Sequence, residues 1–319
     1  MQYKLKKIRS DASFREFFRL KKGNKTSIIV TARKERFRNL IVYSAINKFL
    51  RGKGIYTPKT IKQHFSDGIM EIEDFGNNTL LHFVKKSKNI FPLYKKSIDV
   101  ILKLQKIKPT NKIKIKSNRN LKLSNYNLRN LHKESDLFLD WYLPGILGKK
   151  RSKRFKRKIK IELNKLYKKI YFKNKFIVHR DFHVSNIMPL KNKLGIIDTQ
   201  DAILGNPMYD VASLIDDVRI QIPLAIKNKV FQYYLKKAPL RKNIYILKND
   251  FDILSIQRNL KILGIFYRLY KRDKKPQYLK YLPYTWKLIE LRMKNKIFKN
   301  LEKILLDVVN KKLRKKKLK

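Results

Sequence analysis

Two short apolar runs near the middle of the chain constrain its fold more than any other feature of the sequence. They are Phe176-Ile-Val-His179 and Leu194-Gly-Ile-Ile-Asp198, and turn-forming residues flank both. Such short runs between turn signals predict short buried strands. Apolar residues recur at helical spacing on both sides of these two runs. The two predicted strands would therefore form a small β insert in a helical region. Helices are predicted over 80–86, 92–105, 135–142 and 153–171, and again from residue 209.

The first 75 residues show a different pattern, with strands around a single helix. The helix is predicted over 36–52, where apolar residues recur at helical spacing and glycine ends the pattern. Asp74-Phe-Gly-Asn-Asn78 is rich in turn formers and predicts a hinge. The predicted strands cover 17–20, 26–32, 59–65 and 68–73. We therefore predict an α+β fold with two lobes, a β-rich lobe over 1–75 and a mostly helical lobe over 76–319.

The residues after the first apolar run carry the pattern His-Arg-Asp-x-x-x-x-Asn, at His179, Arg180, Asp181 and Asn186. In kinases the Asp of this loop accepts the proton of the acceptor hydroxyl, and the Asn holds Mg²⁺. This spacing has a physical reason. The end of the strand positions Asp181 near the phosphate, and the short loop that follows places Asn186 next to Asp181. Asp198 ends the second predicted strand, where a carboxylate can complete the oxygen ligands of Mg²⁺.

An alternative interpretation is a chance Asp and Asn in a surface loop, because the bare pattern is only moderately specific. The position after a predicted strand, the second histidine at His183 and the strand-terminal Asp198 all favour phosphoryl transfer. Asp181 is therefore the candidate catalytic base, and Asn186 and Asp198 are the candidate metal ligands.

The loop from His179 to Asn186 resembles the catalytic loop of aminoglycoside phosphotransferase-type kinases, which have a protein-kinase-like fold. Other stretches are similar to one branch of that family, the anomeric kinases of N-acetylmuramate and N-acetylglucosamine. The most specific are Ser10-Asp-Ala-Ser-Phe-Arg15 and Gln257-Arg-Asn-Leu-Lys-Ile-Leu-Gly264. The others are Glu73-Asp-Phe-Gly76, Phe138-Leu-Asp-Trp141, Gly195-Ile-Ile-Asp-Thr-Gln-Asp-Ala202 and Tyr209-Asp-Val-Ala-Ser-Leu-Ile-Asp216. The resemblance extends over nearly the whole chain.

The resemblance implies that the cofactors are ATP and Mg²⁺, and that an amino sugar is converted to its 1-phosphate in peptidoglycan recycling. Asp181 would be the base for the anomeric hydroxyl, and Asn186 and Asp198 would hold Mg²⁺. Glu73 and Phe75 would belong to the hinge that binds adenine. The place of a phosphate-covering loop is taken by Ser10, Asp11, Ala12 and Ser13. By composition alone, an ordinary turn is an equally good interpretation of these four residues.

The resemblance also implies supporting roles for three residues. His179 and His183 belong to the catalytic loop, and Asp210 would begin a helix and brace that loop.

The sequence departs from the kinase pattern at one point. Kinases usually carry a lysine on the third strand, paired with an acid on the following helix, but the corresponding place near Val30 is apolar. The group that anchors the phosphates is therefore left open.

The charge of the chain is extreme, because 79 Lys and Arg against 24 Asp and Glu give a net charge of +55. One interpretation is a kinase-fold protein that binds nucleic acid or a membrane surface without catalysis. The basic residues are spread from end to end of the chain, which favours drift in amino-acid composition as the origin of the charge. We therefore expect no specific nucleic-acid partner.

A further alternative is a kinase of another small hydroxyl acceptor, such as an aminoglycoside or a choline-like compound.

The N-terminus has no apolar segment typical of a signal peptide, and no run approaches the roughly 18 apolar residues of a membrane span. The chain also contains no cysteine, so disulfides and thiolate chemistry are excluded. We therefore expect a cytoplasmic protein without membrane insertion.

Overall fold

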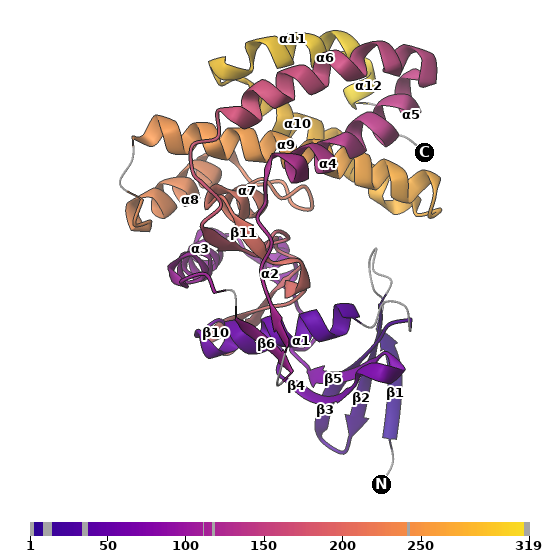
Figure 1. Ribbon diagram of the computed structural model, residues 1–319, viewed down its shortest axis with the longest axis vertical. Helices are drawn as coiled ribbons and strands as arrows, with labels where there is room; N and C mark the ends of the chain where they lie inside the picture. Colours follow the sequence, from indigo (N-terminus) through magenta and orange to yellow (C-terminus); the bar gives the residue numbers. More distant parts are fainter. Residues whose placement is uncertain are drawn as a thin grey trace. The chain divides into compact units, whose positions relative to one another are not determined.

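The computed structural model describes residues 3–8, 15–33, 38–110, 112–116, 119–240 and 243–315. The predicted phosphate-covering loop, Ser10 to Ser13, lies outside these residues. The chain forms two compact units, which can be followed by sequence colour in Figure 1. The first unit comprises residues 1–124 and 176–204, and the second comprises residues 125–175 and 205–319. The two predicted lobes, 1–75 and 76–319, were defined from sequence patterns, whereas the two units are defined by contacts within the structure. The predicted lobe boundary between residues 75 and 76 therefore stays a prediction.

An antiparallel five-stranded sheet with the order β1-β2-β3-β5-β4 opens the first unit (Figure 1). Its strands are β1 (Tyr3–Ile8), β2 (Glu16–Lys22), β3 (Lys25–Thr31), β4 (Thr60–His64) and β5 (Ile69–Glu73). Alternation along the central strand β3 buries Ile28 and Val30 together with Met70 and Ile72 of β5. The four strands predicted in this region are confirmed, with small shifts at their ends.

The helix α1 (Arg38–Gly52) packs Leu40 and Tyr43 into the core of this sheet. Its buried residues recur at the spacing of one helix face, which is the pattern that predicted the helix. Gly54 follows the helix with φ +79°, in the left-handed region where glycine is favoured. The sequence of α1 contains neither Asp nor Glu.

The rest of the first unit consists of helices and short strands. Its helices are α2 (Leu80–Lys86) and α3 (Phe91–Lys106), with 3-10 turns η2 (Phe65–Asp67) and η4 (Thr199–Asp201). Its strands are β6 (Ile113–Lys116), β7 (Arg119–Leu121), β8 (Phe176–Val178), β9 (Ile187–Leu190), β10 (Lys193–Ile196) and β11 (Ile203–Gly205). β8 and β10 confirm the two strands predicted from the apolar runs. β10 pairs with β9, and β8 pairs with β11.

The second unit is helical. Its elements are α4 (Leu128–Leu137), the π-helical turn η3 (Phe138–Tyr142), α5 (Leu143–Leu147), α6 (Lys149–Lys168), α7 (Met208–Ile215), α8 (Leu224–Lys237), α9 (Ile244–Lys271), η5 (Pro276–Tyr281), α10 (Leu282–Met293), η6 (Lys296–Phe298), α11 (Lys299–Val308) and α12 (Lys311–Lys315). Most residues of α9 are buried, and it contacts α4, α7 and α10. In the described part of the chain, no helix combines the length and apolar character that a membrane crossing requires.

A close approach between α9 and η3 depends on a single glycine. A Cβ added at Gly264 would lie 2.2 Å from the backbone carbon of Leu137 and 2.5 Å from the backbone nitrogen of Phe138. Backbone atoms do not move aside for a methyl group, so glycine is needed where these two segments touch.

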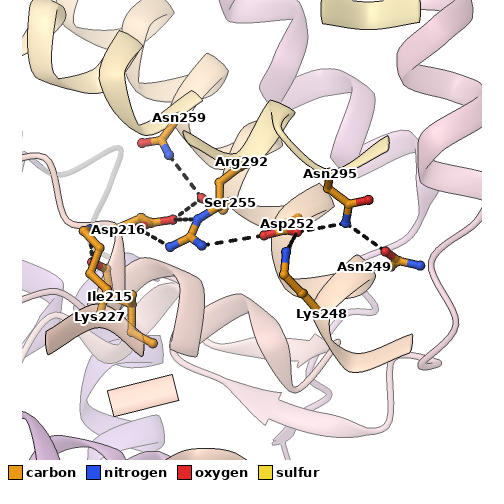
Figure 2. A network of polar contacts seen from close by, with 10 residues as sticks. All are labelled: Ile215, Asp216, Lys227, Lys248, Asn249, Asp252, Ser255, Asn259, Arg292 and Asn295. Atoms are coloured by element: carbon orange, nitrogen blue, oxygen red, sulfur yellow. Dashed lines mark hydrogen bonds and ion pairs between the residues drawn. The ribbon is translucent and has the colours of Figure 1, made fainter. Parts of the chain in front are cut away.

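A buried ion-pair network connects α8, α9 and α10 through Asp216, the residue after α7 (Figure 2). Asp216 accepts hydrogen bonds from Lys227 Nζ at 2.8 Å, from Arg292 Nε at 2.7 Å and from Ser255 Oγ at 2.6 Å. Burial alone would raise the pKa of Asp216, but the charges of Lys227 and Arg292 outweigh burial and hold the pKa well below its usual range. Asp216 is therefore an ionised group inside the helical unit.

Candidate functional site

The candidate site lies in the first unit, around the loop between β8 and β9. His179 follows β8 and is almost fully buried. Its Nε2 lies 2.9 Å from the carbonyl oxygen of Ile197, and its Nδ1 lies 3.3 Å from the backbone nitrogen of Asp181. A ring protonated on Nε2 satisfies both contacts, because Nε2 then donates and Nδ1 accepts. His179 thereby joins the loop to the residues that follow β10.

The loop closes on the backbone of Asp181. The Asp181 carbonyl oxygen accepts hydrogen bonds from His183 N and from Asn186 Nδ2, each at 3.0 Å. His183 Nε2 also lies 3.4 Å from Asn186 Nδ2. Arg180 has φ 77°, a left-handed conformation that is costly for a non-glycine residue. These contacts bring His179, Asp181, His183 and Asn186 together, as the sequence pattern requires.

Asp198 enters the same site from the end of β10. The Asn186 carbonyl oxygen accepts a hydrogen bond from Ile197 N at 3.0 Å, so Asn186 and Asp198 stand at the same end of the β9–β10 pair. Asp198 itself is left-handed, with φ 66°, and its side chain is 37% exposed. The structure therefore places the two predicted metal ligands close together, beside Asp181.

The side chains at this position fit a magnesium ion bound together with a phosphate. The Asn186 amide nitrogen is used toward Asp181, so the amide oxygen is the end left for a cation. In the described residues, no group of three or more His, Cys, Asp or Glu could hold a metal. Mg²⁺ commonly takes only one or two side chains and completes its shell with substrate phosphates and water. The assignment of Asn186 and Asp198 as its ligands stays a prediction.

The predicted adenine hinge uses the Glu73 side chain for internal contacts. Tyr56 Oη and Arg51 Nη1 donate to its two carboxylate oxygens at 2.6 and 2.8 Å, and Lys59 N lies 3.2 Å away. Burial alone would raise the pKa of Glu73, but these hydrogen bonds and the Arg51 charge lower it overall. The Glu73 carboxylate therefore makes internal contacts, and the Glu73 backbone nitrogen donates to the Lys59 carbonyl oxygen at 2.9 Å.

Phe75 is likewise a packing residue. Its ring stacks on Tyr56 with centroids 5.2 Å apart, and a Cβ at Gly195 would lie 2.6 Å from it. Between these two residues, Asp74 accepts hydrogen bonds from Arg19 Nε at 2.6 Å and from Gly76 N at 2.8 Å. The hinge is thus fixed to β2 and β10, and nucleotide binding by Glu73 and Phe75 stays a prediction.

Asp210 lies in the second unit, in the first turn of α7, and is buried. Its predicted place near the start of a helix agrees with the structure. Its predicted contact with the catalytic loop stays a prediction.

The block from Gln257 to Gly264 is buried in α9 of the second unit. Gln257 Nε2 donates to Glu134 Oε2 at 3.1 Å, and Lys261 Nζ lies 3.1 Å from Glu134 Oε1. Arg258 is also buried. This block therefore lies mostly in the core of the helical unit, where its polar side chains form internal contacts.

Sequence reasoning did not assign a site role to Arg15, although it belongs to the Ser10-Asp-Ala-Ser-Phe-Arg15 block. Arg15 Nη2 lies 2.5 Å from Asp198 Oδ1, and Nη1 donates to Gln200 Oε1 at 3.1 Å. Thr199 Oγ1 donates to Asn47 Oδ1 of α1 at 2.6 Å. No local signal could reveal these contacts, since the partners are 183, 185 and 152 residues apart.

Comparisons with known proteins identify the family of the chain. The model of the phosphotransferase enzyme family matches residues 4–243, about three quarters of the chain. A Pseudomonas aeruginosa protein named N-acetylmuramate/N-acetylglucosamine kinase is 28% identical over 288 residues, which cover 88% of this chain and 81% of that protein. A Neisseria meningitidis protein of the same name is 26% identical over 282 residues, covering 86% and 81%.

Among solved structures, the ADP-bound aminoglycoside phosphotransferase APH(2'')-Ib is similar, with a TM-score of 0.60 and 16% identity. The similarity covers 90% of this chain and 92% of that one. At this identity the comparison concerns the fold, and it confirms the predicted α+β, protein-kinase-like architecture. The chain belongs to the phosphotransferase enzyme family and is an ATP-dependent kinase.

Proposed function

We propose that this kinase phosphorylates the anomeric hydroxyl of an amino sugar, N-acetylmuramate or N-acetylglucosamine, in cytoplasmic recycling of the cell wall. The observation that carries the proposal is the similarity to relatives named as kinases of these sugars, which extends over most of both chains. The site fits the chemistry, because phosphoryl transfer depends mainly on positioning and charge neutralisation.

In the proposed reaction Asp181 accepts the proton of the anomeric hydroxyl. The hydroxyl oxygen then bonds to the γ-phosphorus of ATP, and the bond from that phosphorus to the bridging oxygen breaks to release ADP. Asn186 and Asp198 would hold Mg²⁺, which neutralises phosphate charge when it is bound. His179 and His183 keep the loop in shape around the base through the contacts described above.

An aminoglycoside is a second candidate acceptor, since a structurally similar protein is an aminoglycoside phosphotransferase. An aminoglycoside is a polycation and would need an acidic pocket. A chain with 79 basic and 24 acidic residues offers few carboxylates from which to build one. A neutral or anionic sugar is therefore the better match.

The test is an acceptor assay with ATP and Mg²⁺, followed by ³¹P NMR. N-acetylmuramate or N-acetylglucosamine should give a sugar 1-phosphate, whereas the 1-O-methyl glycoside of N-acetylglucosamine, which lacks the reacting hydroxyl, should give none. Phosphorylation of the methyl glycoside would show that another hydroxyl reacts. Turnover of an aminoglycoside but of neither sugar would replace the proposal with the second candidate.

A further inference from the structure

Among the residues that the structure describes, the phosphate anchor of most kinases is absent from both of its expected places. That anchor is a lysine of the third strand paired with an acid on the following helix. In β3 the corresponding residue is Val30, which is fully buried in the core of the sheet. The helix α1, as described from Arg38 to Gly52, carries no acid. A kinase built this way still has to neutralise the phosphates of its nucleotide.

Arg15 stands beside the place that the lysine would occupy. It directly precedes β2, whose first residue, Glu16, pairs with Thr31 at the end of β3. Arg15 is 5% exposed, and its guanidinium lies 5.6 Å from the ring centroids of both Phe17 and Tyr43. Aromatic faces favour a cation at this distance. α1 thus contributes Tyr43 to the contact, where a kinase helix would contribute an acid.

The partners of Arg15 belong to the candidate metal site. Arg15 contacts Asp198 Oδ1, and Gln200 Nε2 donates to the same oxygen at 3.0 Å. Both contacts use Oδ1, so Oδ2 is the oxygen that Asp198 can present to a cation. Gln200 accepts from Arg15 in turn, so the three side chains contact one another, and Gln200 Nε2 also donates to Asp201 Oδ2 at 3.0 Å. Arg15 and Gln200 therefore fix the orientation of the Asp198 carboxylate through Oδ1 alone.

We propose that Arg15 replaces the strand lysine: it orients Asp198 and binds the phosphate chain of the nucleotide. A guanidinium has five N–H donors in a planar fork, so one side chain can hold a carboxylate and a phosphate together. A lysine ammonium is a point charge and matches this geometry less well. The proposal does not depend on which acceptor the kinase uses.

The test compares the binding of adenosine, ADP and ATP by calorimetry, with and without Mg²⁺ and without any acceptor. Arg15→Met should weaken ADP and ATP binding about 10- to 100-fold, the range expected for losing a charged hydrogen bond. Adenosine has no phosphate, so its affinity should stay within about twofold. Lys21→Met removes an exposed positive charge from β2, the strand that follows Arg15, and should leave all three affinities unchanged.

Two results would overturn the proposal. Unchanged ADP affinity in Arg15→Met would remove Arg15 from the phosphate site. An equal loss for adenosine and ADP would mean that Arg15 only supports the pocket. Arg15→Lys serves if the methionine variant does not fold, because it keeps the charge but not the fork. It should lose part of the ADP affinity and none of the adenosine affinity, and an unchanged ADP affinity would again reject the proposal.

Discussion

Asp198 and Asp216 are each paired with an arginine, and they differ in how much water reaches them. Asp198 in the first unit receives Arg15 and Gln200 on one oxygen, and its side chain is 37% exposed. Asp216 in the second unit receives hydrogen bonds on both oxygens, from Lys227 and from Arg292, and its side chain is 1% exposed.

The difference separates a group available to a ligand from a group that serves only the fold. An enclosed carboxylate with both oxygens used has no position left for a metal or phosphate. A carboxylate held on one oxygen is oriented but still open to a ligand. Pairing with an arginine alone therefore does not identify a structural aspartate, and exposure and the number of occupied oxygens must be considered together.

The largest effect that we predict is on folding, at Asp216. Asp216→Asn should lower the free energy of unfolding by about 3–5 kcal/mol, because it leaves Lys227 and Arg292 with an uncompensated buried charge. Urea denaturation followed by circular dichroism measures this change. Asp216→Asn/Lys227→Met should be less destabilised than the single variant. A single variant as stable as the wild type would contradict a structural role for the network.

The second prediction concerns Asp198, where activity should change much more than stability. Asp198→Asn should reduce kcat/KM about 100-fold or more, because the charge proposed to bind the metal is lost. The asparagine oxygen can still accept from Arg15, but the buried Arg15 loses its counter-charge. Because Asp198 is 37% exposed and Gln200 keeps its bond to Arg15, the free energy of unfolding should fall by less than at Asp216. Steady-state kinetics and urea denaturation on the same preparation test both parts. Full activity of this variant would remove Asp198 from the metal site.

The third prediction uses pH to isolate Asp216. Its pKa is depressed in the folded protein, so the stability that it contributes is complete above the unfolded pKa of about 3.9 and is lost as the pH falls below it. Each pH unit in that window should remove up to about 1.4 kcal/mol from the wild type. The difference in unfolding free energy between wild type and Asp216→Asn should shrink accordingly. A difference that is constant between pH 5 and pH 2.5 would contradict the depressed pKa.

The smallest effect should come from an exposed ion pair of the same helical unit. Lys156 and Asp140 form a 2.5 Å pair, but their side chains are 44% and 46% exposed. Lys156→Ala should therefore change the unfolding free energy by less than about 1 kcal/mol, and salt should screen this small contribution further. A loss as large as that at Asp216 would show that exposure does not explain the difference between the two kinds of pair.

Some elements were predictable because their signals are local. The strands β8 and β10 were evident as short apolar runs, and α2 was predicted over its full length, Leu80–Lys86. The start of α4 was not predicted correctly from the sequence. It begins at Leu128, whereas the prediction began at residue 135, because its first turns are mostly polar and hide the apolar spacing. The signal present was Asn127, whose side chain accepts from Asn130 N at 3.1 Å and caps the helix.

The candidate site likewise has one part that was predictable from local sequence and one part that was not. The sequence by itself determined the loop from His179 to Asn186, because these residues lie close along the chain and their hydrogen bonds are geometrically local. Only the tertiary structure decided which cation meets Asp198. Arg15 lies 183 residues away, and the two meet only where the residue before β2 packs beside the residues after β10. Spacing in a sequence fixes short-range contacts, whereas packing of separate elements selects long-range partners.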